Sequence, residues 1–104
     1  MAQVFYPISS IRVDCSTVSK RVALPANATN VRFFNNTGSL AWVNIGDSTV
    51  TATIPALDTA GSGFPIAPNS VESFTESPNG GATHVAIVLS SGTGVVNVTM
   101  GEGW

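Results

Sequence analysis

Hydrophobic and polar residues alternate along most of the chain in short runs, a pattern typical of half-buried β-strands. Val, Ile and Thr are frequent in these runs, and Gly, Pro, Asn and Ser separate them at short intervals. No window combines the i, i+3, i+4 apolar spacing of an amphipathic helix with a cap and a stop. The runs predict strands over residues 4–6, 11–14, 17–24, 30–35, 40–46, 50–54, 70–75, 83–89 and 95–100.

Prolines lie between or at the ends of most of these runs, where a missing amide hydrogen costs no ladder hydrogen bond: Pro25, Pro55, Pro65, Pro68 and Pro78. The longest irregular stretch covers residues 55–69, in which Phe64 and Ile66 form a short apolar anchor. This stretch is either a Greek-key crossover or a contact arm. The pattern as a whole predicts an all-β fold, an antiparallel β-sandwich of jelly-roll or Greek-key type, as a single domain over residues 1–104.

Two segments resemble each other when Ala28 is aligned with Ala82. Thr29 then falls on Thr83 and Val31 on Val85, and a glycine followed by Ser or Thr ends both segments. With one residue deleted in the turn, Val43-Asn44-Ile45 falls on Val96-Asn97-Val98. We interpret the match as two pseudo-repeated hairpins, one in each half of the sandwich.

The repeat assigns the faces of these strands. Alternation places the following residues toward the core: Val31, Phe33, Val43, Ile45, Val85, Ile87, Val96 and Val98. The opposite side is also apolar, since it carries Phe34, Leu40, Trp42, Ala86 and Val88 as well as Arg32. A strand that is apolar on both sides is usually covered on both sides, either by a second layer of the same chain or by a partner.

The composition favours a protein that functions as a subunit of a larger assembly. Charged residues make up only 10% of the chain and the formal net charge is -2, which disfavours a strong nucleic-acid binder. All the basic residues lie in the first third, at Arg12, Lys20, Arg21 and Arg32, and most acids follow them. Such a polarised charge suits a complementary neighbour. No segment approaches the roughly 20 apolar residues of a membrane span, and the N-terminus does not read as a signal peptide.

Catalytic chemistry is hard to place on this sequence. His84 is the only histidine, it lies beside no nucleophile elbow, and its repeat partner is Asn30, so we expect a strand-end histidine rather than a catalytic one. Cys15 is alone and is predicted to be a small buried hydrophobe. No spacing indicates a metal site, a phosphate loop or a pair of glycosidase carboxylates. We therefore expect no enzyme activity, no catalytic residues and no cofactor.

Two further signals are weak. The sequons that begin at Asn27, Asn35 and Asn97 are interpreted as by-products of Asn- and Thr-rich turns. Trp42 and Asn44 share a strand face and could hold a sugar by stacking and an amide hydrogen bond, which keeps a carbohydrate-binding module as an alternative function.

The chain as a whole resembles small bacteriophage virion proteins of similar length. The resemblance rests mainly on four segments: Ile45–Thr53 (IGDSTVTAT), Phe64–Glu72 (FPIAPNSVE), Ala82–Ala86 (ATHVA) and Val98–Trp104 (VTMGEGW). It implies a β-sandwich of the kind used as capsid cement or decoration, located in the virion. A tail or head–tail adaptor component is the other possibility within the particle.

These observations predict a contact surface rather than an active site. The candidate interface residues are Arg12, Arg32, Phe34, Trp42, Val88 and Trp104. The expected partners are the major capsid protein or another virion protein, and further copies of this chain as a trimer or dimer, with no nucleic acid and no membrane. Residues 1–10 are expected to form a free contact arm, and Trp104 is expected to dock on its own sandwich or on a neighbour.

Overall fold

The computed structural model describes residues 6–24, 30–61, 63–75 and 83–102, and these residues form β-strands joined by turns and coil, with no helix. The prediction of an all-β protein is confirmed. The strands are β1 (Tyr6–Cys15), β2 (Lys20–Ala23), β3 (Asn30–Asn36), β4 (Ala41–Gly46), β5 (Phe64–Ile66), β6 (Ser70–Thr75), β7 (His84–Leu89) and β8 (Gly94–Glu102).

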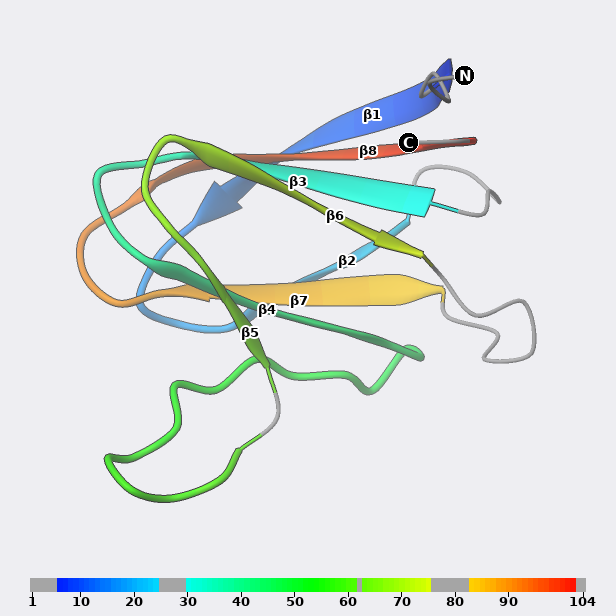
Figure 1. Ribbon diagram of the computed structural model, residues 1–104. Coiled ribbons are helices and arrows are strands. Elements are labelled where there is room, and N and C mark those ends of the chain that lie inside the picture. The colour runs from blue at the N-terminus through cyan, green and yellow to red at the C-terminus, as the bar shows by residue number, and fades with distance from the viewer. Residues whose placement is uncertain (1–5, 25–29, 62, 76–82, 103–104) are drawn as a thin grey trace.

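The strands form two four-stranded antiparallel sheets that pack face to face (Figure 1). Sheet A has the order β1-β8-β3-β6 and sheet B the order β2-β7-β4-β5. The pairs β1–β8, β2–β7, β3–β6 and β4–β5 are those of one long antiparallel ribbon rolled into two layers. This connectivity is that of a jelly roll, so the first of the two predicted sandwich types is the one observed.

The core lies between the sheets and contains the residues that alternation placed inward. Val31, Phe33, Val85 and Ile87 are completely buried, as are Val96 and Val98 on β8. Val43 is buried, while Ile45, nearer the end of β4, is only half-buried. Each fully buried Val, Ile or Phe stabilises the fold by about 1.5–3 kcal/mol relative to an exposed one.

Several strand boundaries differ from the sequence prediction. Tyr6, the last residue of the predicted strand at 4–6, and the predicted strand at 11–14 belong to one strand, β1, whose register shifts between Pro7 and Ser9. Proline has no amide hydrogen for the ladder, and such residues are accommodated at bulges on edge strands. Residues 1–5 lie outside the described residues. The predicted strand at 17–24 is reduced to β2.

The prediction of a strand at 50–54 is wrong, because this segment pairs with none of the strands that the structure describes. It runs as coil across the outer face of sheet B, where Val50 and Ala52 pack beside Ala86 and Val88. The place next to β4 is taken instead by β5, the segment that was expected to be only an apolar anchor. Pro65 is accommodated there because β5 is an edge strand.

The repeated segments are arches rather than hairpins, and the hairpin prediction is corrected here. β3 and β4 lie in different sheets, and so do β7 and β8. The two arches instead pair with each other, β3 with β8 and β4 with β7. Their turns meet, since the hydroxyl groups of Ser39 and Ser91 lie 2.9 Å apart. Each turn must carry the chain across the roughly 10 Å between packed sheets, which a hairpin turn does not do.

The contact between the two arches leaves no room for a side chain at Gly94. A methyl group on Gly94 would lie 2.6 Å from Cγ2 of Thr37, which is itself buried. We expect Gly94→Ala to lower the free energy of unfolding by about 2 kcal/mol through overpacking. Chemical denaturation measures this, with Gly38→Ala as control, because nothing lies within 4 Å of a methyl group there. Equal tolerance of the two substitutions would contradict the arch contact.

Candidate functional site

The outer face of sheet A brings together three of the predicted interface residues. The strand register aligns Arg12 of β1 with Asn97 of β8, and Asn97 with Phe34 of β3. Phe34 in turn lies opposite Val71 of β6, which completes a row across the whole sheet. Arg32 stands in the neighbouring row, two residues before Phe34 on the same side of β3. The sequence therefore identified residues that the fold places on one face.

This face combines apolar and cationic groups. Phe34 is 37% exposed and Val71 52% exposed, although both are large apolar side chains. Arg12 is exposed and Arg32 is half-buried. The row that contains Arg32 is otherwise formed by small hydroxyl side chains, where Ser10 and Thr99 are hydrogen-bonded at 2.8 Å. Among the described residues, the acid beside these rows is Asp14, two residues after Arg12, so the described central part of the face is cationic.

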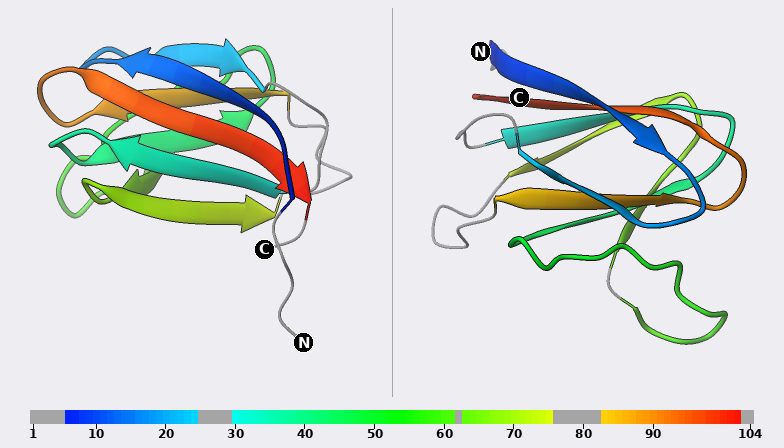
Figure 2. Two further views of the ribbon diagram at one scale, coloured as in Figure 1. Left: turned by 90° about the horizontal axis from the view of Figure 1, so that it is seen from above. Right: turned by 180° about the vertical axis from the view of Figure 1, so that it is seen from behind.

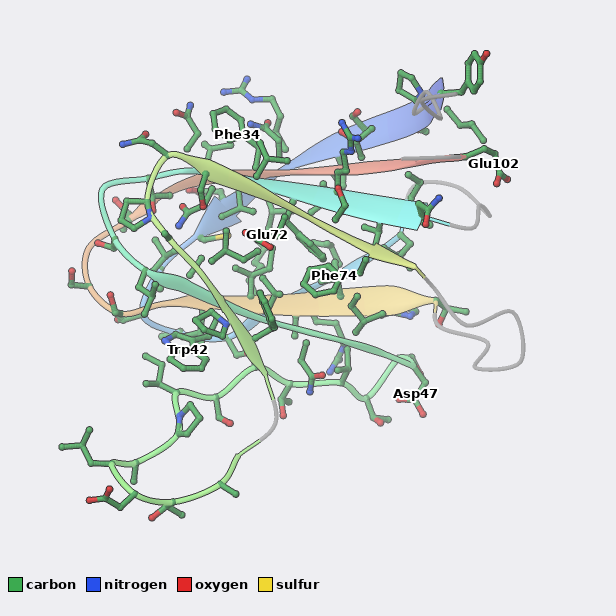
Figure 3. The ribbon with its side chains drawn as sticks, viewed as in Figure 1. Phe34, Trp42, Asp47, Glu72, Phe74 and Glu102 are labelled. Atoms are coloured by element: carbon green, nitrogen blue, oxygen red, sulfur yellow. The ribbon has the colours of Figure 1, made fainter. Side chains whose placement is uncertain are left out.

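Trp42 and Val88 lie on the opposite side of the sandwich, so the predicted interface is divided between two faces. Figure 3 shows Phe34 directed away from the sandwich on the sheet A side and Trp42 directed toward the coil on the sheet B side. Val88 is only 5% exposed, because it packs with Ala52 and Trp42 of its own chain. The prediction of Val88 as an interface residue is therefore corrected: an intrachain layer covers it.

This layer explains why β7 is apolar on both sides. Its residues from Val85 to Leu89 are all buried, with Val85, Ile87 and Leu89 in the main core and Ala86 and Val88 under the coil. Of the two explanations that the sequence left open, a second layer of the same chain applies to sheet B. The outer face of sheet A has no such layer among the described residues.

The amide of Asn44 also serves this intrachain layer. Its Nδ2 donates to the carbonyl of Thr51 at 3.2 Å, and its Oδ1 accepts from the amide of Ile45 at 3.0 Å. Trp42 beside it is half-buried against Ala52 and Val88. The pair that could have held a sugar is thus engaged in holding residues 50–52 onto sheet B.

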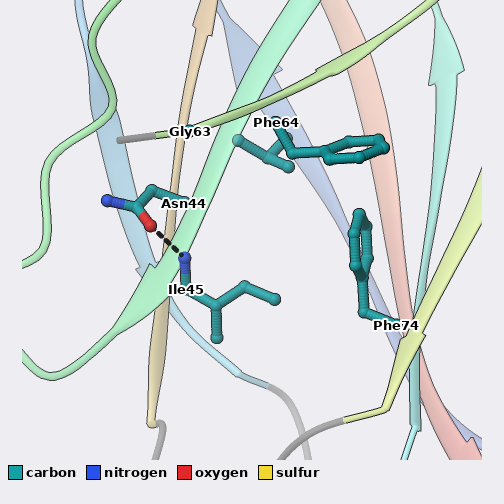
Figure 4. Close-up of a pocket in the computed structure, with 6 residues that line it drawn as sticks. Asn44, Ile45, Gly63, Phe64 and Phe74 are labelled. Carbon is teal, nitrogen blue, oxygen red and sulfur yellow. Dashed lines mark hydrogen bonds between the residues drawn. The ribbon is translucent and has the colours of Figure 1, made fainter. Parts of the chain in front are cut away.

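A small pocket opens between the two sheets where β5 and β6 form their edges (Figure 4). Its volume is about 190 Å³, and it is lined by Val43, Asn44, Ile45, Gly63, Phe64 and Phe74. The rings of Phe64 and Phe74 meet edge to face with centroids 4.9 Å apart. None of these described lining residues is titratable, so they form an apolar recess of side-chain size rather than a site for chemistry.

The ionisable residues are dispersed over the molecule. His84 is half-buried at the start of β7, where Nδ1 lies 2.7 Å from the hydroxyl oxygen of Thr83. Cys15 is buried, as the sequence predicted, and this burial raises the pKa of its thiol to about 11. Hydrogen bonds from Thr49 lower the pKa of Asp47. Within the described ranges, no three His, Cys, Asp or Glu side chains gather closely enough to hold a metal ion.

Asn35 is the residue that sequence reasoning missed. It was interpreted as part of a chance sequon, yet its side chain is completely buried and bonded on both sides of the amide. The sequence signal was an Asn two residues before a Thr at the end of a strand, which is also the pattern of a side chain that closes a turn. Its role is structural.

Contacts were also predicted for the two ends of the chain, Trp104 and residues 1–10. Trp104 lies outside the described residues. The free arm predicted for residues 1–10 is wrong from Tyr6 onward, because Tyr6, Pro7, Ser9 and Ser10 pair with β8. Tyr6 and Ile8 nevertheless remain exposed on this strand, which is the edge of sheet A. The described residues contain no helix that could cross a membrane.

No family model matches the chain, and neither a curated protein nor a solved structure does.

Proposed function

We propose that this chain is a non-enzymatic structural protein of a bacteriophage virion that binds and stabilises the capsid surface as a cement or decoration protein. The observation that carries the proposal is that six of the eight exposed large apolar side chains of the described residues lie in three separated regions. These regions are the edge strand β1 with Tyr6 and Ile8, the outer face of sheet A with Phe34 and Val71, and the coil after β4 with Ile54 and Leu57.

Separated apolar regions suit a protein that contacts several neighbours at once. Isolated exposed apolar residues are normal on monomeric proteins, but a pair in each of three regions offers three distinct contacts. Cement proteins act through many modest contacts that symmetry repeats over a particle. The low charge of the chain supports the same proposal, since charge is what keeps free small domains apart.

The fold is compatible with this role. Eight-stranded jelly rolls occur in viral capsid proteins and also in lectins and cupins, so the fold alone does not select among them. The chemistry of the described side chains favours the structural role, because the exposed surface offers apolar and hydroxyl groups rather than a cluster of ionisable ones.

We assign the contact with the capsid protein to the edge strand β1. In the described sheet its outer edge pairs with no strand, and Tyr6 and Ile8 are exposed beside it. An extended segment of a partner could add to this edge through backbone hydrogen bonds, with the two side chains providing apolar contact. Cement binding would then need no deep pocket.

The test is to purify phage particles from the host that carries the gene and to locate the chain in them by mass spectrometry and immunogold electron microscopy. We expect the chain on the capsid surface. A chain that carries both Tyr6→Ser and Ile8→Ser should bind to the particles several-fold less, and particles assembled with this variant should break at a lower temperature. If the immunogold label were confined to the tail, the chain would be a tail or head–tail adaptor component rather than a cement protein. Absence from the particle would overturn the proposal.

A further inference from the structure

The coil between β4 and β5 contains a tight turn that presents an apolar and an acidic side chain next to each other. The amide of Thr59 donates to the carbonyl of Ala56 at 3.1 Å, which closes the turn around Leu57 and Asp58. Asp58 has a φ of 60°, a left-handed conformation that Asp tolerates better than most residues. Leu57 is 93% exposed, more than any other large apolar residue described. We call residues 56–59 the loop tip.

The loop tip is carried by a segment that is anchored on its β4 side and narrow at its neck. On the β4 side, the amide of Ala52 donates to the hydroxyl of Ser19 at 3.0 Å, and Ala52 is buried beside Val88. At the neck of the loop the chain passes close to itself, since a methyl group on Gly61 would lie 3.0 Å from Cγ of Pro55. The loop therefore projects from the sheet B side in a defined direction (Figures 1 and 2).

The outer face of sheet A carries the complementary groups. It offers Phe34 and Val71 to an apolar side chain, and Arg12 and Arg32 to an acid. In Figure 1 this face forms the side of the sandwich away from the loop tip, so a tip cannot reach the face of its own chain. A second copy can meet this requirement, because every copy carries one tip and one face.

We propose that the loop tip of one copy binds the outer face of sheet A of the next copy. Leu57 packs against Phe34 and Val71 of the next copy, and Asp58 forms ion pairs with Arg12 and Arg32 there. Such a contact joins two different surfaces, so it is heterologous: it closes into a ring when the rotation allows and otherwise continues as a chain. This inference concerns contacts between copies and goes beyond the proposed capsid binding.

The apolar pocket of Figure 4 is a less suitable receptor for the tip. Glu72 stands two residues before Phe74 on the same side of β6, so a docked tip would bring Asp58 toward a like charge. The outer face of sheet A instead provides two cations for that acid. Charge complementarity therefore selects the face over the pocket.

A mixing experiment tests the heterologous contact directly. One variant carries Leu57→Asp and has an intact face, and the other carries Val71→Asp and has an intact tip. We expect the wild-type chain to associate in sedimentation equilibrium, more weakly at high salt, and each variant alone to be monomeric at 10.7 kDa. An equal mixture should form a heterodimer, because one intact tip can still bind one intact face.

Controls separate a lost contact from a lost fold. Val18→Asp introduces the same change at an exposed residue of the turn between β1 and β2, and it should leave association unchanged. Arg12→Glu should weaken association about tenfold and Asp58→Arg should restore it in the double variant. All variants are checked by thermal unfolding. A monomeric wild-type chain at about 1 mM, or a mixture that stays monomeric, would overturn the proposal whether or not the chain binds capsids.

Discussion

The Asn35→Ala variant is expected to lose about 3–4 kcal/mol of unfolding free energy, out of the 5–15 kcal/mol that small proteins possess. The side-chain Nδ2 lies within hydrogen-bond distance of the carbonyls of Ser39 at 2.8 Å, Ile66 at 2.9 Å and Ala67 at 3.2 Å. Its Oδ1 accepts from the backbone amide of Thr37 at 3.1 Å and from its hydroxyl at 2.6 Å. One amide thus holds the turn after β3 against the turn before β6.

Alanine would remove these bonds without removing the groups that they satisfy. The carbonyl of Ile66 and the amide of Thr37 would remain in a region where Asn35, Ile66 and Thr37 are all buried, and an unsatisfied buried polar group costs about 1–3 kcal/mol. A loss of this size corresponds to a decrease in Tm of roughly 15–25 °C. Differential scanning calorimetry measures it.

The neighbouring Asn36 is a matched control. It is the same residue type on the same strand, but it is exposed on the outer face of sheet A. We expect Asn36→Ala to change the unfolding free energy by less than about 0.5 kcal/mol. Similar losses for the two variants would show that Asn35 is not the anchor described here.

Asn35→Asp adds a pH-dependent test of the same network. The substitution places a carboxylate against three carbonyl oxygens in a buried position, which raises the pKa of the new carboxyl in the folded state. A raised folded pKa means that stability is present below the unfolded pKa of about 4 and is lost as the pH rises through the folded pKa. The variant should therefore be closer to wild type at pH 3 than at pH 7, and a flat difference would contradict the argument.

The sequence predicted which side chains are buried better than it predicted which strands pair with each other. Alternation placed Val31, Phe33, Val85 and Ile87 in the core correctly, because period two is a property of each strand by itself. Strand order depends on which turns cross from one sheet to the other. The sequence of the short turn between β3 and β4 does not distinguish an arch between sheets from a hairpin within one sheet. The repeat was recognised, but its geometry required the pairing of β3 with β8.

The wrong strand at 50–54 has an instructive cause. Val50 and Ala52 do alternate with exposed residues, since both pack toward the outer face of sheet B while Thr51 and Thr53 are exposed. Alternation reports burial on one side of an extended chain and does not report ladder pairing. The segment is an extended cover held by Asn44 and Ser19 rather than a strand of a sheet.

The candidate interface was divided for the same reason. Phe34 and Val88 both occupy outward positions on their strands, and nothing in their local sequence distinguishes them. Only the path of residues 50–52 decides that Val88 is covered while Phe34 remains exposed. The predicted interface residues that the fold leaves on the outer face of sheet A are Arg12, Arg32 and Phe34, and these form the proposed receptor for the loop tip.

Val88→Asp gives the second large effect that we expect, a loss of about 3 kcal/mol or more in unfolding free energy. A surface interface residue would tolerate the change, but Val88 lies between Trp42 and Ala52 with 5% exposure. A buried carboxylate without a partner is strongly destabilising. Val71→Asp is the matched control, because Val71 is 52% exposed on the outer face of sheet A and should lose less than about 0.5 kcal/mol.

The form of the Val88→Asp response tests the layered architecture. Val88 belongs to a small cluster with Ala52, Ala86, Trp42 and Val50, and this cluster is separate from the main core between the sheets. The carboxylate can therefore reach water if residues 47–61 lift away from sheet B, at the cost of this small cluster alone. We expect fast hydrogen exchange at the amide of Ala52 and new protease cleavage within 47–61, while the amides of β3 and β8 stay protected. Uniform loss of protection in both sheets would instead mean that the cover and the sandwich unfold as one unit.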